Sequence, residues 1–193
     1  ITLVNFKLRH ICVFSIKKIM KSGKNIVFLG MMGSGKTSIG FLISKKLNLE
    51  FFDTDQFIEK ELNMKISKIF KNKGESFFRE YEEKITLDIL KKKNIVIALG
   101  GGSFLNKKVR NEVLANHLSF WLKCDNKTII DRIKNSSKRP IALSATNIEL
   151  NDMIKLRSKY YMKAKYKVDC SGLSKNEVIN KIISIYENKE INN

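Results

Sequence analysis

The fold of this chain is decided by one stretch, Gly30-Met31-Met32-Gly33-Ser34-Gly35-Lys36-Thr37. It matches the phosphate-binding pattern G-x-x-x-x-G-K-[ST], the P-loop. Glycines allow the tight turns that direct several backbone N–H groups at one phosphate. A short apolar run, residues 25–29, precedes the stretch, and residues 36–47 follow it with apolar side chains at helical spacing. Because a buried strand and an amphipathic helix flank the pattern, it predicts a binding site for a nucleoside triphosphate.

Individual positions of the P-loop have separate tasks. The ammonium group of Lys36 can reach the β- and γ-phosphates, and the hydroxyl of Thr37 can bind Mg²⁺. We therefore expect Mg²⁺ as the cofactor, with ATP as the phosphoryl donor. The residues expected to contact the nucleotide here are Gly33, Ser34, Gly35, Lys36, Thr37 and Ser38.

The rest of the chain alternates short apolar runs with helical patterns. Further strands are expected at residues 49–52, 94–99 and 119–122 and near Val168. Helices are expected as two short stretches within 57–70, then at 75–91, 127–133, 148–163 and from the N-cap Ser174 to about Tyr186. Strands separated by helices predict an α/β fold, a P-loop NTPase sandwich of three layers with a parallel sheet between helices. Residues 20–193 are expected to form a single domain.

Residues 1–19 are excluded from this fold prediction. They are apolar and basic, contain no acidic residue and begin with Ile1, whereas Met20 stands just before the first expected strand. Three interpretations compete: sequence upstream of the true start, a targeting segment, or an additional strand or helix. We favour a misplaced start or a disordered extension, since the stretch lacks the Arg and Ser content of a transit peptide.

Composition excludes several classes of protein. The chain has 193 residues, and none of its apolar stretches approaches the ~20 residues of a membrane-spanning helix. The formal net charge is +18, mostly from lysines spread along the sequence, which argues only weakly for any partner. Cys12, Cys124 and Cys170 form no C-x-x-C pair, so we expect no disulfide framework or zinc site and favour a cytoplasmic protein.

The P-loop alone does not define the kind of enzyme. A GTPase needs an N-K-x-D sequence, and the nearest candidate, residues 126–129, lacks the acid. A helicase would be longer and would carry further motifs. The size therefore favours a small-molecule or nucleotide kinase.

Three other features narrow the choice. Asp53 and Asp55 follow the second expected strand, where open α/β sheets bind ligands, although helix capping explains such a pair equally well. Arg79 and Glu82 lie one helical turn apart, where an exposed ion pair is the default interpretation. Three glycines at 100–102 end a strand abruptly and permit close approach of the backbone to a ligand.

Taken in order, these motifs resemble those of the shikimate kinase family. The resemblance spans about residues 25–186 and rests on six segments: GMMGSGKT, FDTD, GESFFREYE, ALGGG, DRIKNSSKRP and RSKYY. It implies a fold like that of nucleoside monophosphate kinases, with five parallel strands and a mobile lid at about residues 134–145. It also implies transfer of phosphate from Mg-ATP to the 3-hydroxyl of shikimate, a step towards chorismate and the aromatic amino acids.

The resemblance further implies roles for residues that would hold the acceptor. Arg79 and Arg157 match arginines that bind the carboxylate of shikimate, for which the planar guanidinium is well suited. Asp55 matches the acid that contacts the ring hydroxyls and is the candidate base. Gly101 and Gly102 match backbone that meets the substrate. In addition, Phe70 and Phe78 would wall the pocket, and Glu82 would steady Arg79.

Other roles implied by the resemblance concern the donor. Asp53 matches an acid that helps to hold Mg²⁺ together with Thr37. Arg139 matches the lid arginine that stabilises the transferred phosphoryl group together with Lys36, and it counts with Lys36 and Asp55 as catalytic. Arg132 matches an arginine placed against adenine, with a surface charge as the competing interpretation.

Departures from the family pattern are few. R-x-P-L-Y is replaced by R-S-K-Y-Y at residues 157–161, so the register of Arg157 is less certain. Thr86 stands at a position where an apolar residue is expected, and we expect it at the edge of the surface. No clear match for an adenine contact occurs at residues 170–173.

Two other functions compete with shikimate phosphorylation. One is another small-molecule kinase of the same fold, acting on gluconate or a nucleoside monophosphate. The other is an ATP-binding module without transfer activity, which the retention of Lys36, Asp53, Asp55 and Arg139 disfavours. We expect the partners to be shikimate and ATP, with no nucleic acid and no membrane, and we expect a monomer.

Overall fold

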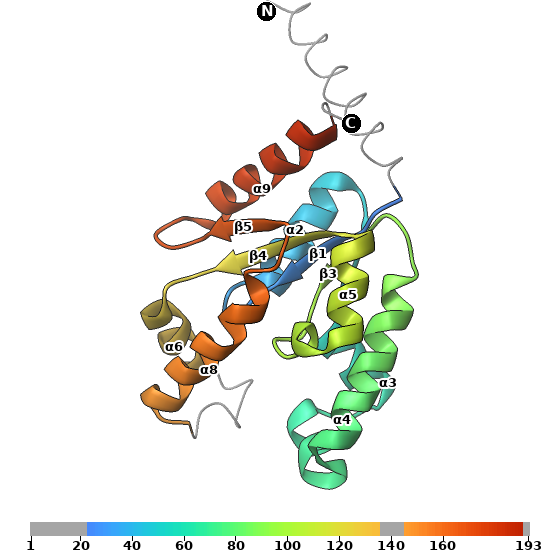
Figure 1. The fold of residues 1–193 in the computed structure, drawn as a ribbon, viewed down its shortest axis with the longest axis vertical. Coiled ribbons are helices and arrows are strands. Elements are labelled where there is room, and N and C mark those ends of the chain that lie inside the picture. The colour runs from blue at the N-terminus through green and yellow to red at the C-terminus, as the bar shows by residue number, and fades with distance from the viewer. Residues whose placement is uncertain (1–22, 136–144, 191–193) are drawn as a thin grey trace, which may run out of the picture.

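A parallel sheet of five strands organises the computed structural model, which describes residues 23–135 and 145–190 (Figure 1). The strand order is β2-β3-β1-β4-β5, and each neighbouring pair is parallel. The strands are β1 (Ile26–Leu29), β2 (Glu50–Asp53), β3 (Ile95–Ala98), β4 (Leu118–Lys123) and β5 (Tyr166–Asp169). The helices between and after them are α2 (Lys36–Leu47), α3 (Thr54–Glu61), α4 (Ile66–Leu90), α5 (Lys107–Asn116), α6 (Asn126–Lys134), α8 (Asn147–Tyr161) and α9 (Lys175–Glu190), with a short 3₁₀ turn at Ser103–Leu105.

Helices cover both faces of the sheet, and each face carries its own apolar core. Alternate residues of β1 separate these cores: Val27 and Leu29 face α4, α5, α6 and α8, whereas Ile26 and Phe28 face α2 and α9. All four residues of β1 and of β3 are buried, as a central parallel strand requires. A smaller apolar cluster joins α3 to the first half of α4.

The central position of β1 determines where a ligand can bind. After β1 the chain crosses to β2 and returns to β3 on one side, and then passes to β4 and β5 on the other. Ligands of open parallel sheets bind where the strand order reverses, beyond the carboxyl ends of the strands. The P-loop follows β1, and the three glycines follow β3, so both motifs lie at this edge of the sheet.

The five-stranded parallel α/β fold is confirmed, but two helices differ from the prediction. Helix α3 begins at Thr54 rather than near residue 57, because the Asp53 carboxylate caps it by accepting from the Gln56 N–H. Helix α5 was missed. Its residues are mostly polar, and only Val109 and Val113 are buried, which leaves almost no periodic signal.

The prediction for Thr86 was wrong. Its side chain lies in the interior of α4 and is 0% exposed, and its hydroxyl oxygen has no hydrogen-bond partner among the described residues. Thr86 thus occupies a position in the apolar core, where its hydroxyl oxygen is the one polar atom of the side chain. Two other predictions, the segment 1–19 and most of the lid at 134–145, lie outside the described residues. None of the helices within 23–135 and 145–190 is long and apolar enough to cross a membrane.

Candidate active site

The P-loop turns from β1 into α2 through residues with left-handed backbone. Gly33 has φ 80° and Gly35 has φ 94°, values that glycine adopts without steric cost. A hydrogen bond of 3.1 Å from Ser34 N–H to the Met31 carbonyl closes the turn. Because α2 begins at Lys36, the N-terminal N–H groups and the positive dipole end of this helix face the loop, which is the arrangement that binds phosphate.

The ammonium group of Lys36 is held over the loop. The residue is 7% exposed, and Nζ donates to the carbonyl oxygens of Gly30 at 2.8 Å and Met31 at 3.0 Å. Its charge is therefore concentrated where phosphate oxygens would lie. The side-chain oxygen of Ser34 is buried beside it without a partner among the described residues, so it too could serve a bound anion. Ser38 instead donates its hydroxyl to the Gly35 carbonyl and braces the loop.

Thr37 and Asp53 meet beside the P-loop. The Thr37 hydroxyl donates to Asp53 Oδ2 at 2.6 Å, while Asp53 Oδ1 accepts from Gln56 N–H at 3.1 Å. The capping interpretation of Asp53 is confirmed, since one oxygen caps α3, and the other oxygen faces Thr37 of the P-loop. A hydroxyl and a carboxylate at this point form a pair of hard oxygen ligands that suits Mg²⁺.

Two carboxylates approach the first of the three glycines. A methyl group on Gly100 would collide with Asp55 Oδ1 and would lie 2.7 Å from Glu82 Oε1. Asp55 belongs to the first turn of α3 and Glu82 to α4. Because Gly100 has no side chain, two carboxylates from different helices can both lie close to the end of β3.

The two remaining glycines receive one arginine each. A methyl group on Gly102 would lie 2.5 Å from Nη1 of Arg79, and one on Gly101 would lie 3.3 Å from Nη1 of Arg157. Arg79 comes from α4 and Arg157 from α8, so two distant helices bring guanidinium groups to the same loop. The structure therefore places together all four predicted substrate-binding residues of this loop region, and Asp55 lies at its first glycine.

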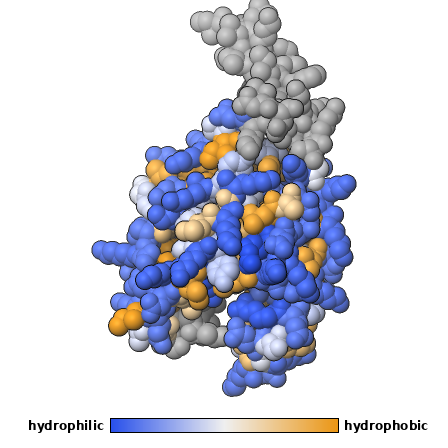
Figure 2. All heavy atoms as spheres, viewed as in Figure 1, coloured by the Kyte–Doolittle hydropathy of each residue, from blue (hydrophilic) through white to orange (hydrophobic). Residues whose placement is uncertain are grey.

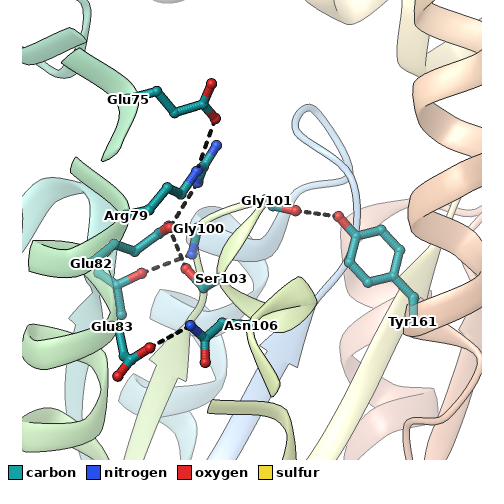
Figure 3. Close-up of polar contacts among 10 residues, drawn as sticks. Glu75, Arg79, Glu82, Glu83, Gly100, Gly101, Ser103, Asn106 and Tyr161 are labelled. Atoms are coloured by element: carbon teal, nitrogen blue, oxygen red, sulfur yellow. Dashed lines mark hydrogen bonds and ion pairs between the residues drawn. The ribbon is translucent and has the colours of Figure 1, made fainter. Parts of the chain in front are cut away.

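A chain of hydrogen bonds holds Arg79 in place (Figure 3). Glu82 Oε2 accepts from Arg79 Nη1 at 2.7 Å, and Glu82 Oε1 accepts from the Ser103 hydroxyl at 2.5 Å. Glu75 adds a weaker contact of 3.2 Å to Arg79 Nε. Burial lowers the pKa of Arg79, but Glu82 and Glu75 outweigh it and raise the pKa above its ordinary value. The expected pairing of Glu82 with Arg79 is present, and Ser103 extends it.

Two aromatic rings lie beneath Arg79. The ring centroids of Phe70 and Phe78 are 4.7 Å apart, and the Arg79 guanidinium carbon lies 5.8 Å and 5.2 Å from them. Phe78 is buried in the cluster between α3 and α4, and Phe70 packs against it. The two rings thus attract the cation through their faces, but neither is among the residues that line the pocket described below.

Tyr161, the last residue of the RSKYY segment, also lies in this region, although no role was predicted for it. It is 1% exposed, and its hydroxyl donates to the Gly101 carbonyl at 2.5 Å. Burial raises the pKa of Tyr161 to about 12, so the hydroxyl keeps its proton. A signal was available, because Tyr161 follows Arg157 by four residues and must share its face of α8.

A pocket of about 710 Å³ opens between α4, the glycine loop and α8. In the space-filling view, the surface is hollowed beside the lobe that contains α3 and α4 (Figure 2). Several of the residues that line it are charged, including both arginines. The residues around the pocket are Glu75, Arg79, Glu82, Glu83, Gly102, Ser103, Leu105, Asn106, Val109, Asp152, Met153, Leu156 and Arg157.

The other side of the P-loop contacts α6 and the end of β4. Arg132 Nη1 donates to the Gly33 carbonyl at 3.1 Å, so this exposed arginine lies over the nucleotide loop. The thiol of Cys124 donates to the Ser34 carbonyl, and its hydrogen bond with Cys170 lowers the pKa of Cys124 to about 7. Arg139, predicted to be catalytic, lies outside the described residues.

Comparison with known proteins agrees with this geometry. The family profile "Shikimate kinase" matches residues 32–187. A shikimate kinase of Thermodesulfovibrio yellowstonii is 41% identical over 166 residues, which cover 85% of this chain and 95% of that protein. A shikimate kinase of Bacillus subtilis is also 41% identical, over 83% of this chain and 87% of that protein.

Solved structures give the same result. A shikimate kinase from Acinetobacter baumannii, in complex with shikimate, matches with a TM-score of 0.82 and 26% identity over 88% of this chain and 96% of that one. The shikimate kinase of Aquifex aeolicus matches with a TM-score of 0.77 and 32% identity, covering 86% and 97% of the two chains. A gluconokinase from Sinorhizobium meliloti shares only the fold, with a TM-score of 0.53 and 14% identity over 88% and 95% of the two chains. The chain belongs to the shikimate kinase family.

Proposed function

We propose that this protein transfers the terminal phosphoryl group of ATP to the 3-hydroxyl of shikimate and so forms shikimate 3-phosphate, a step towards chorismate and the aromatic amino acids. One observation carries the proposal: Arg79 and Arg157 reach the glycine loop from two helices, next to a P-loop and an aspartate. A compact acceptor with one carboxylate and several hydroxyls matches this set of groups. The A. baumannii relative was solved with shikimate bound.

The arginines would hold the carboxylate of the acceptor. Each guanidinium can make two parallel hydrogen bonds to a carboxylate, and the pocket keeps them partly out of water, where such bonds are stronger. Arg79 stays oriented because Glu82 and Phe78 hold it from two sides. The ring of the acceptor would then lie along Gly101 and Gly102, which offer no side chains to obstruct it.

Asp55 would act on the attacking hydroxyl. It lies in the first turn of α3, directly after β2, and next to Gly100. A carboxylate there can accept the hydroxyl proton and align the oxygen with the γ-phosphorus. Lys36 and, as a continuing prediction, Arg139 would stabilise the charge that spreads over the transferred group.

Mg²⁺ would be held by Thr37 and Asp53, in part through water, and it would neutralise the phosphate charge when bound. Within the described part of the chain, no cluster of three or more His, Cys, Asp or Glu side chains could hold a metal by itself. This agrees with a Mg²⁺ ion that arrives with the nucleotide and takes most of its ligands from phosphate and water. Arg132 would lie against the adenine, since it already contacts the P-loop.

Three further properties belong to the same proposal. The domain comprises residues 20–193, with a lid at about 134–145 that closes over the phosphates and excludes water. The enzyme acts as a monomer. It works in the cytoplasm, which suits a protein whose two described cysteines are free thiols.

An ATP-coupled assay with a panel of acceptors tests the proposal. We expect turnover with shikimate and none with gluconate or nucleoside monophosphates. Turnover with only one of the other acceptors would identify a different small-molecule kinase. ATP binding without any product would identify a non-catalytic module.

Asp55→Asn is the matched variant for this assay. It keeps the shape of the side chain and removes the base, so kcat with shikimate should fall by about 10²–10⁴-fold. ATP affinity should stay unchanged. An unaltered kcat would remove Asp55 from the mechanism while leaving the substrate assignment intact.

A further inference from the structure

The hydroxyl of Tyr161 holds the carbonyl group of Gly101, in the middle of the glycine loop (Figure 3). The phenol comes from α8, and the side chains of α4 stand on the opposite side of the loop. A neutral hydrogen bond between buried groups is directional, and Tyr161 has little freedom because its ring is enclosed and packs on Trp121, with centroids 6.1 Å apart. The carbonyl direction of Gly101 is therefore determined by α8.

A carbonyl direction also determines an N–H direction. The peptide unit between Gly101 and Gly102 is planar and trans, so the Gly102 N–H points away from the Gly101 oxygen. Since Tyr161 draws that oxygen towards α8, the N–H is turned towards the α4 side, where Arg79 lies against Gly102. No residue within the described ranges accepts a hydrogen bond from the Gly102 N–H.

The three glycines explain why the orientation of this peptide needs a side-chain hydrogen bond. Peptide units flanked by residues without side chains rotate more freely than others, and three successive glycines give no steric preference of their own. Ser103 N–H donates to the Gly100 carbonyl, and Leu105 N–H donates to the Gly102 carbonyl, which leaves the Gly101 carbonyl without backbone support. The bond from Tyr161 supplies it.

We propose that Tyr161 is a positioning residue for the reaction proposed above: it orients the Gly101–Gly102 peptide so that the Gly102 N–H donates to an oxygen of the acceptor. The inference rests on the proposed function. Arg157 and Tyr161 lie one turn apart on α8 and both contact Gly101, so one helix face supplies a cation for the acceptor and the orientation of a backbone donor. The hydroxyl remains a donor throughout the working pH range, since its pKa is about 12.

Tyr161→Phe tests the inference, with Tyr160→Phe as the control. Tyr160 is the adjacent residue on α8, and its ring contacts Arg110 and Lys163 on another side of the helix. Both variants lose one hydroxyl and keep the ring. For each protein, kcat, the KM for shikimate, the KM for ATP and the melting temperature are measured, together with the Kd for shikimate by calorimetry without ATP.

In Tyr161→Phe we expect the shikimate KM and Kd to rise about five- to tenfold, the loss of one oriented hydrogen bond. The ATP KM should not change, and Tyr160→Phe should match the wild type. A lower melting temperature with an unchanged shikimate KM and Kd would overturn the inference, because a structural bond alone would behave in that way. Equal changes in both KM values would overturn it too. Wild-type protein that fails to turn over shikimate would instead overturn the proposed function.

Discussion

The two halves of the site are built in opposite ways. The donor half, residues 30–38, is nearly continuous in sequence, and its geometry comes from backbone turns and the start of α2. The acceptor half joins α4, the glycine loop and α8, which are far apart in sequence and are held by buried side-chain contacts. Many enzymes bind the phosphates of a nucleotide, and backbone groups of one short loop are enough to bind them. The acceptor differs from enzyme to enzyme, and its binding site forms only when distant segments are brought together by the fold.

Replacing Lys36 by Met should have the largest effect and should break the donor half alone. The side chain keeps its length and loses its charge, so kcat should fall by about 10²–10³-fold. The Kd for shikimate in calorimetry should be unchanged, because Lys36 Nζ is bonded to the carbonyl oxygens of Gly30 and Met31, within the donor half. Lys46→Met, at the other end of α2, is the control. A large loss of shikimate affinity in Lys36→Met would show that the halves are not separable.

Replacing Arg157 by Ala should break the acceptor half. The charge-assisted bonds to the carboxylate would be lost, which corresponds to a rise of about 10–100-fold in the shikimate KM. The ATP KM should stay within about twofold of the wild-type value, as in the control Lys155→Ala on the exposed side of α8. A change confined to the ATP KM would mean that Arg157 serves the nucleotide.

Replacing Glu82 by Gln should weaken shikimate binding by the acceptor half indirectly, through Arg79. The amide oxygen can still accept from Arg79 and the amide NH₂ can donate to the Ser103 oxygen, but the counter-charge is lost, so we expect the shikimate KM to rise about tenfold. The free energy of unfolding should fall by about 1–2 kcal/mol, less than for a fully buried pair, because the Arg79 side chain is 38% exposed. Kinetics and thermal unfolding of Glu80→Gln, an exposed neighbour, provide the baseline. Wild-type kinetics in Glu82→Gln would show that Arg79 is oriented without the negative charge of Glu82.

Replacing Thr86 by Val should leave both halves intact and stabilise the core below them. Its hydroxyl is buried without a partner in the described structure, so removing it at constant shape should raise stability by about 1 kcal/mol, or about 2–4 °C in Tm. Thr86→Ser keeps the hydroxyl, loses a methyl group and should be less stable than the wild type. A destabilised Thr86→Val protein would indicate that the hydroxyl makes a bond to a buried water.

The same contrast explains what could be predicted from sequence. Local sequence pattern was enough to predict three features: the P-loop, a parallel sheet and the pair of acids after β2. Each of these predictions used only residues that are close together in sequence. The pairing of Arg79 with Glu82 was visible as a helical spacing, but the role of Ser103 as its second support required knowledge of where β3 ends relative to α4. Tyr161 ends the RSKYY segment and lies four residues after Arg157, but neither feature indicated its hydrogen bond to the Gly101 carbonyl.

Two predictions from the sequence, for Thr86 and for helix α5, failed because burial depends on parts of the fold that are distant in sequence. Thr86 was assigned to the edge of the surface although the family pattern expects an apolar residue there, and α4 is in fact buried along that face. Helix α5 is held by a capping asparagine, Asn106, and by two valines, too few apolar positions to show a period. Its existence depends on the sheet that it covers.

The three glycines have a consequence for how such a site can evolve. Gly100, Gly101 and Gly102 each lie against the charged end of a side chain from another segment, so a larger residue at any of them would displace a charged group of the site. Losing Arg79 first would leave Glu82 buried with an uncompensated charge. Neither order of single steps is neutral. The acceptor half is therefore entrenched, and a lineage could change its substrate only through correlated replacements in several segments, while the donor half could be kept or copied almost unaltered.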